Sequence, residues 1–284
     1  MFLLINIVYY KTEKNHRQVA FEVYDAIDRA GINEGYTGLV LGDSVARQIF
    51  HPEYQDESDD ICYLATNQAI TTVGNFMLLE RFIENNPQLE DVYYVARPDS
   101  IMGNVNFVYT YSYFVTPLYN ESMSQYLEPE TREEIEAVFG RFCARGGLPK
   151  WMLAKYPKLL DIYQNGCSSI LQLRRWMGDA GEEDMAALYL GKMKEVCDEK
   201  NINFYLLAAP LSESYQDSFD EMKSRLSFEG KEELLYQYMD SIVYVQEDEL
   251  VDGVHMSESF LEKNREKIKE RIMRTSHIKG GTVK

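Results

Sequence analysis

Three short apolar runs alternate with helical stretches in the first hundred residues, and this alternation constrains the fold more than any other feature. The runs are Gly38–Leu41, Asp60–Ala65 and Asp91–Ala96, and polar or proline-containing turns end them. Between them, residues 45–50 and 70–85 have the spacing of apolar side chains that is typical of helices. A strand–helix–strand–helix–strand order predicts a parallel sheet covered by helices on both faces.

The alternation is interrupted between residues 104 and 200. Helical patterns dominate there, at Glu128–Phe142, 151–176 and Glu182–Lys200, and a strand is expected only at Val105–Phe114. This segment predicts a helical insertion at 104–200, which either packs as a cap or forms part of a substrate wall.

The sheet pattern resumes after the insertion. Strands are expected at Asn203–Ala209 and Ser241–Val245, and helices at about 215–228 and at Ser257–Arg274. Because no linker interrupts the pattern, the 284 residues predict a single α/β domain over residues 1–284.

Charge and hydropathy exclude several classes of protein. The chain holds 29 Lys and Arg against 46 Asp and Glu, a net charge of −17, so it repels phosphate and no nucleic-acid partner is expected. No apolar run approaches the ~20 residues of a membrane-spanning helix, which excludes a many-pass membrane protein. With 45% hydrophobic and 26% charged residues, the composition is that of a folded globular chain.

The N-terminal segment Met1–Tyr10 is mostly apolar, yet it is too short to cross a bilayer. No basic segment precedes it and no small-residue cleavage site follows it, so it does not read as a signal peptide. It either packs on the domain as a first helix or strand, or it is the end of a membrane anchor that begins further upstream. The second alternative means membrane attachment through this segment, and the compartment stays open between the cytoplasm and the cell envelope.

The four cysteines are interpreted as small core residues. They form no C-x-x-C pair, which gives no support to zinc or thioredoxin chemistry. The chain also lacks phosphate-binding glycine-rich loops and an EF-hand pattern. We therefore expect no cofactor and no metal. The cysteines are Cys62, Cys143, Cys167 and Cys197.

Sites in an open parallel sheet form outside the carboxyl ends of the strands. Ser44 directly follows the first expected strand and opens a helix, where its backbone N–H can serve an oxyanion. Gly42 allows a sharp turn beside it. In the alternative interpretation, Asp43 or Ser44 is only the N-cap of the helix.

One histidine is placed where it could serve such a serine. Of His16, His51, His255 and His277, only His255 lies at an expected strand-to-helix edge. Asp252, three residues earlier, could orient the imidazole, as a base for a serine nucleophile requires. Alternatively, this segment is a helix-entry loop with a capping aspartate.

Gly42-Asp43-Ser44 near the N-terminus, together with Asp252-Gly253-Val254-His255 near the C-terminus, resembles the SGNH (GDSL-type) hydrolase superfamily. The resemblance implies a flavodoxin-like three-layer α/β/α sandwich with a central parallel sheet. It also implies that Ser44 is the nucleophile, His255 the base and Asp252 the carboxylate that orients His255. The hydrolase chemistry of this family requires no cofactor.

The middle of the chain departs from the family pattern. Ala69 stands where the resemblance implies an oxyanion-hole glycine, and its backbone N–H survives that change. The turn after the third strand, Arg97–Ser100, lacks the family's asparagine, so Asn67 is the candidate for the missing amide. The expected oxyanion hole therefore consists of Ser44, Asn67 and Ala69. Loss of one donor costs about 10²–10³ in rate.

The chain further resembles a divergent subgroup found with bacterial cell-surface polysaccharide genes. The resemblance rests on the apolar N-terminus, the nucleophile block and the aromatic stretch Phe107–Tyr119. It implies an O-acyl, first of all acetyl, esterase or acyltransferase that acts on a glycan or other small ester at the cell envelope. We interpret the alternating aromatic residues as packing rather than as a glycan platform.

Two further functional hypotheses stay open. One is a catalytically decayed SGNH-fold protein that binds or assembles glycans, which the altered turn after the third strand favours. The other is an unrelated binding protein, in which the side chains of Ser44 and His255 would lie far apart.

Overall fold

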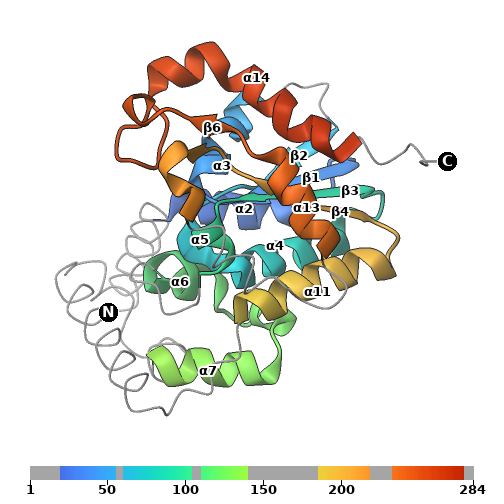
Figure 1. Ribbon diagram of the computed structural model, residues 1–284. Coiled ribbons are helices and arrows are strands. Elements are labelled where there is room, and N and C mark those ends of the chain that lie inside the picture. The colour runs from blue at the N-terminus through green and yellow to red at the C-terminus, as the bar shows by residue number, and fades with distance from the viewer. Residues whose placement is uncertain (1–19, 56–59, 104–109, 140–184, 218–231, 278–284) are drawn as a thin grey trace, which may run out of the picture.

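A four-stranded, all-parallel sheet forms the centre of the computed structural model, which describes residues 20–55, 60–103, 110–139, 185–217 and 232–277 (Figure 1). The strand order is β2-β1-β3-β4. The strands are β1 (Gly38–Gly42), β2 (Ile61–Tyr63), β3 (Asp91–Ala96) and β4 (Asn203–Ala208). The predicted parallel α/β sheet is therefore confirmed, and β3 has the predicted bounds.

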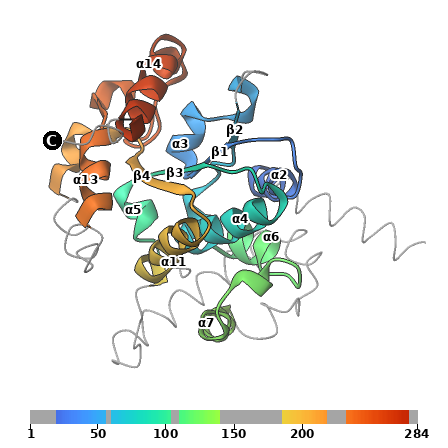
Figure 2. The ribbon, with the colours of Figure 1, turned by 90° about the vertical axis from the view of Figure 1, so that its right-hand side faces the viewer.

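Helices cover both faces of the sheet (Figure 2). One face carries α3 (Ser44–Ile49) and α14 (Glu258–His277). The other carries α2 (Phe21–Ala30), α4 (Thr71–Asn85) and α11 (Met185–Glu199). The helices expected at 45–50, 70–85 and Ser257–Arg274 are thus present with shifted ends.

Alternate side chains of β3 enter the two cores. Val92 and Tyr94 pack among residues of the α4 side, whereas Tyr93 and Val95 pack on the side of α3 and α14. All four are buried. This period of two, with apolar residues on both faces, is what a parallel strand between two helical layers requires.

The insertion expected at 104–200 contributes to the core where it is described. Helix α11 packs against α4 and β4, so it is one of the helices that flank the sheet and forms part of the crossover between β3 and β4. Helix α7 (Pro129–Phe139) matches the helix expected at Glu128–Phe142 in its described part. Residues 140–184, which include the helix expected at 151–176, lie outside the described part.

The strand expected at Val105–Phe114 is wrong in the part that is described. Tyr111–Val115 forms a π-helical segment, and α6 (Thr116–Leu118) follows it. All residues from Phe114 to Leu118 are buried, whereas a half-buried strand would bury every second residue. The alternation of aromatic residues resembles a strand, but burial does not alternate along this segment.

The last strand is also shorter than expected. Only Tyr244–Val245 (β6) is extended, and it pairs in parallel with β5 (Leu211–Ser212). Ser241 is instead the last residue of helix α13 (Glu232–Ser241), and its hydroxyl donates to the Tyr238 carbonyl and accepts from the Ala208 N–H. Of the helix expected at about 215–228, residues 218–228 lie outside the described ranges, and Glu213–Asp217 forms a 3-10 turn.

Cys62 and Cys197 are buried free thiols, as the interpretation as core residues requires. Cys143, Cys167 and the N-terminal segment 1–19 fall outside the described ranges, so the predictions for them stay untested. Within those ranges, no helix is both long and apolar enough to span a membrane.

Candidate active site

The nucleophile turn, Gly42–Val45, joins β1 to α3 at the carboxyl edge of the sheet. Asp43 is the N-cap of α3, since its Oδ1 accepts hydrogen bonds from the backbone N–H groups of Val45 and Ala46, each 3.0 Å long. Ser44 is the first helical residue. The capping interpretation therefore holds for Asp43, and it leaves the Ser44 hydroxyl free to make other contacts.

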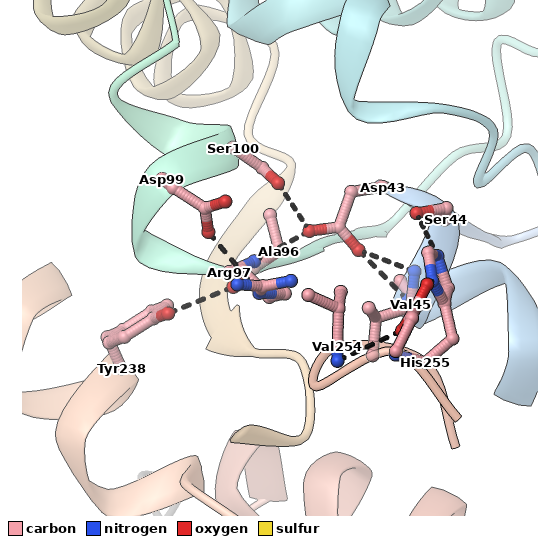
Figure 3. Close-up of polar contacts among 12 residues, drawn as sticks. Asp43, Ser44, Val45, Ala96, Arg97, Asp99, Ser100, Tyr238, Val254 and His255 are labelled. Carbon is pink, nitrogen blue, oxygen red and sulfur yellow. Dashed lines mark hydrogen bonds and ion pairs between the residues drawn. The ribbon is translucent and has the colours of Figure 1, made fainter. Parts of the chain in front are cut away.

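The second oxygen of Asp43 ties this turn to the end of β3. Its Oδ2 accepts from the backbone N–H of Arg97 at 2.8 Å and from the Ser100 hydroxyl at 2.6 Å (Figure 3). The carboxylate is buried, with Asp43 only 2% exposed, and it accepts four hydrogen bonds in all. Such saturation compensates the cost of removing a carboxylate from water.

Gly42 is required for a different reason from the one the sequence suggested. It is the last residue of β1 and has no left-handed φ, but a Cβ added there would lie 2.1 Å from the carbonyl oxygen of Val95. Any larger residue would push β1 away from β3. The glycine thus allows the close approach of the two strands that lets Asp43 reach Arg97 and Ser100.

Ser44, His255 and Asp252 form a continuous hydrogen-bonded chain. Ser44 Oγ lies 2.9 Å from His255 Nε2, and His255 Nδ1 lies 2.8 Å from Asp252 Oδ2. Ser44 and His255 are 211 positions apart in sequence, so only the fold brings them together (Figure 3). The 2.9 Å distance does not fit the hypothesis of an unrelated binding protein, in which these two side chains would lie far apart.

The histidine loop, Leu250–Met256, is held mostly by its own hydrogen bonds. Leu250 and Met256 form an isolated antiparallel bridge, and the Val251 N–H donates to the His255 carbonyl at 2.9 Å. Gly253 has φ +76°, a left-handed conformation that favours glycine. The loop thereby turns back so that the side chains of Asp252 and His255 meet.

Asp252 also accepts from the backbone of its own loop. Its Oδ1 lies 2.7 Å from the His255 N and 3.0 Å from the Val254 N. The hydrogen bonds from the His255 backbone and ring, with that from Val254, lower the pKa of Asp252 to about 2. The carboxylate is therefore ionised at neutral pH and can stabilise a protonated imidazole beside it.

The loop after β2 carries two of the three residues that we expected to form an oxyanion hole, Asn67 and Ala69. The Thr66 N–H donates to the Gly42 carbonyl at 3.0 Å, which places the loop after β2 beside the nucleophile turn. Asn67 Oδ1 accepts from the Ala69 N–H at 2.9 Å, so this expected donor is occupied. Within the described ranges, the backbone N–H of Ser44 and Asn67 Nδ2 have no acceptor.

The turn after β3 has a structural arrangement of its own. Arg97 is buried, its Nε lies 3.3 Å from Asp99 Oδ1, and its guanidinium stacks on the Tyr215 ring with 4.7 Å to the centroid. Burial raises the pKa of Asp99, and Arg97 opposes that shift. An arginine paired in this way occupies the place where the family resemblance implied an asparagine.

Sequence reasoning missed two contacts of this site. Ser100 stood in a turn marked as a candidate, but only the close approach of β1 and β3 shows that it donates to Asp43. Gln48 carried no signal at all, yet its amide pairs with the backbone of Met256. Contacts of this kind depend on tertiary reach, which spacing along the chain does not reveal.

Within the described ranges, no group of three or more His, Cys, Asp or Glu side chains could hold a metal ion. Comparisons with protein-family models, with curated proteins and with solved structures found no match for this chain. The resemblance to the SGNH superfamily thus stays a prediction.

Proposed function

We propose that this protein is a serine ester hydrolase or acyltransferase of the SGNH type. The observation that carries the proposal is the chain of contacts from Ser44 through His255 to Asp252, at 2.9 and 2.8 Å. A hydroxyl, an imidazole and an ionised carboxylate in this order are the components of nucleophilic acyl transfer. The proposed substrate is an O-acyl ester, first of all an acetyl ester, on a glycan or another small alcohol.

The reaction proceeds in two balanced steps. Ser44 Oγ attacks the carbonyl carbon of the ester while its proton moves to His255 Nε2, and the C–O bond to the alcohol then breaks as His255 returns the proton to that alcohol. Water, or a second alcohol in a transferase, attacks the acyl-enzyme with His255 again as base. Asp252 holds the imidazole and stabilises its cationic form.

Two donors are available for the negative charge on the carbonyl oxygen. The Ser44 N–H is the first of α3 and has no acceptor within the described ranges. Asn67 Nδ2 is the second. The Ala69 N–H donates to Oδ1 of the same amide and so fixes its orientation, which leaves Nδ2 as the available donor. Ala69 thus positions Asn67 rather than donating itself. One donor fewer than the expected three predicts a slower enzyme.

The strand order also supports the proposal. The first four strands follow the order 2-1-3-4 of a flavodoxin-like, doubly wound sheet, and β5 pairs with β6 just beyond the end of β4. In such sheets the ligand crevice lies at the carboxyl ends of β1 and β3, where the order reverses. Ser44 follows β1 at this place.

A decayed, glycan-binding SGNH protein is the second candidate. It is favoured by the turn after β3, where Arg97 is paired with Asp99 in place of an amide donor. Binding alone does not require three side chains aligned from serine to carboxylate. The enzyme hypothesis therefore accounts for more of the site.

Hydrolysis of p-nitrophenyl acetate by the wild type, Ser44→Ala and Ser124→Ala tests the proposal. Ser124 is a half-buried serine outside the site, so its variant controls for the loss of a hydroxyl. We expect turnover in the wild type and in Ser124→Ala, and a loss of at least about 10³-fold in Ser44→Ala. Equal rates in all three proteins would favour the binding protein.

A further inference from the structure

Gln48 makes a pair of hydrogen bonds to a single backbone position. Its Nε2 donates to the Met256 carbonyl at 3.0 Å, and its Oε1 accepts from the Met256 N–H at 3.0 Å. Gln48 follows Ser44 by four residues in α3, about one helical turn. Met256 directly follows His255. The amide thus joins the helix of the nucleophile to the loop of the base.

The histidine loop has few other polar ties to α3. The hydrogen bonds of Asp252 to backbone N–H groups and to the imidazole stay within this loop, and Val251 is 70% exposed. The Met256 side chain is buried in the core beside α3, which anchors the end of the loop, but this apolar contact adds no hydrogen bond between the loop and α3. The backbone of this loop must therefore be placed so that the His255 ring stays within hydrogen-bond distance of Ser44.

Helix α14 also contacts Gln48. The Gln48 backbone carbonyl accepts from Arg265 Nε of α14 at 3.1 Å. The Arg265 guanidinium lies over the Tyr54 ring at 3.7 Å from the centroid, so the arginine itself is held in place. Gln48 therefore connects α3, the histidine loop and α14 through its side chain and its backbone.

We propose that Gln48 is a positioning residue. By binding the backbone of Met256, it holds the His255 ring within hydrogen-bond distance of Ser44. A planar amide offers one donor and one acceptor side by side, as the N–H and C=O of one residue in extended backbone require. This inference rests on the proposed function, because it assigns Gln48 a role in that reaction. Gln48 acts through His255 and has no contact with substrate.

Gln48→Met tests this role, because methionine keeps the length of the side chain and removes both hydrogen bonds. We expect kcat for p-nitrophenyl acetate to fall about 10- to 100-fold with KM nearly unchanged, as for a misplacement of about 1 Å. Gln48→Glu should lose at least as much, since its second oxygen would face the Met256 carbonyl. If Gln48 only filled space, both variants would keep the wild-type kcat.

Gln55→Met is the matched control. Gln55 is also half-buried, and its Oε1 accepts from Arg29 Nη2 at 2.8 Å, away from Ser44 and the histidine loop. The same substitution there removes a side-chain hydrogen bond but leaves α3 and the loop untouched. We expect wild-type kcat and KM in this variant, whatever small change it makes to the melting temperature.

Two measurements need no turnover and separate this inference from the proposed function. Hydrogen exchange of the Met256 amide should quicken at least about tenfold in Gln48→Met but not in Gln55→Met. The ¹⁵N shifts of the His255 ring should change in the same variant as the contact with Ser44 is lost. Unchanged exchange and shifts would overturn the role of Gln48, even if the wild type hydrolyses esters. A wild type without turnover would overturn the proposed function alone.

Discussion

Asp43 and Asp252 lie on either side of the contact between Ser44 and His255, and they are held in opposite ways. Asp43 is buried and accepts from two segments far apart in sequence, the start of α3 and the turn after β3. The Asp252 side chain is 54% exposed and, among the residues that the structure describes, accepts only from its own loop. Asp43 thus ties two segments of the fold together, whereas Asp252 contacts His255, the proposed base.

This contrast follows from how each carboxylate is solvated. A buried carboxylate must have its hydrogen bonds replaced by the protein, so its removal leaves buried donors unpaired and destabilises the fold. An exposed carboxylate exchanges protein contacts for water at little cost. The effect of Asp252 is therefore expected in the rate, through the orientation and charge of His255, and the effect of Asp43 in the stability.

The largest expected effect is that of Asp252→Asn on the rate. The amide keeps the shape of the carboxylate but cannot stabilise a protonated imidazole, and it favours the wrong tautomer of His255. We expect hydrolysis of p-nitrophenyl acetate to slow about 10³- to 10⁴-fold. The melting temperature should stay near that of the wild type. A variant with wild-type activity would show that His255 needs no carboxylate.

The next effect is that of Asp43→Ala on stability. The N–H groups of Val45, Ala46 and Arg97 and the hydroxyl of Ser100 would all lose their acceptor. Loss of the cap and of buried partners should lower the free energy of unfolding by at least about 3 kcal/mol. Urea unfolding measures it, with Asp252→Ala as the partner variant, for which less than about 1 kcal/mol is expected. Equal losses of unfolding free energy in the two variants would contradict the contrast between Asp43 and Asp252.

Asn67→Asp tests the proposed donor role of Asn67 Nδ2 separately from the acceptor role of Asn67 Oδ1. Aspartate keeps an oxygen for the Ala69 N–H, so the 3-10 turn should stay intact, but it removes the Nδ2 donor and adds a charge that opposes an oxyanion. We expect kcat to fall about 10²-fold or more with little change in melting temperature. An unchanged kcat would exclude Asn67 from the oxyanion hole.

The smallest effect is the pH dependence that Asp252 gives to stability. Its folded pKa of about 2 lies below the value of about 3.9 for an unfolded aspartate, so the stabilisation is fully present above about pH 4 and is lost as the pH falls through about 2. Solvent screening of the exposed side chain limits it to about 0.5 kcal/mol.

Urea unfolding of the wild type and of Asp252→Asn at about pH 6 and about pH 2 measures this contribution. The wild type should be slightly more stable than the variant at the higher pH, and this difference should be smaller at the lower one. If the wild type and Asp252→Asn differ in stability by the same amount at both pH values, the charge of the Asp252 carboxylate is not the cause of the difference.

The sequence predicted the parts of the site that local chemistry determines. The apolar run Asp91–Ala96 is short and bounded by turn residues, which favours a buried strand. Ser44 follows a run of the same kind, Gly38–Leu41, and was therefore expected at the carboxyl edge of the sheet, together with Asp252 and His255. Tertiary packing decided the remainder. Residues 111–115 are helical with Phe114 packed beside Gly74 of α4, and Gln48 reaches Met256 only because α3 and the histidine loop meet.

The most direct test of the central claim is the site at which a fluorophosphonate reacts with the folded protein. The reagent adds covalently to an activated serine, and peptide mass spectrometry locates the adduct. We expect one adduct on Ser44 in the wild type, none in Ser44→Ala, and a rate at least about 10³-fold slower in His255→Ala. No adduct in the wild type, or an adduct that persists in Ser44→Ala, would contradict the assignment of Ser44 as the nucleophile.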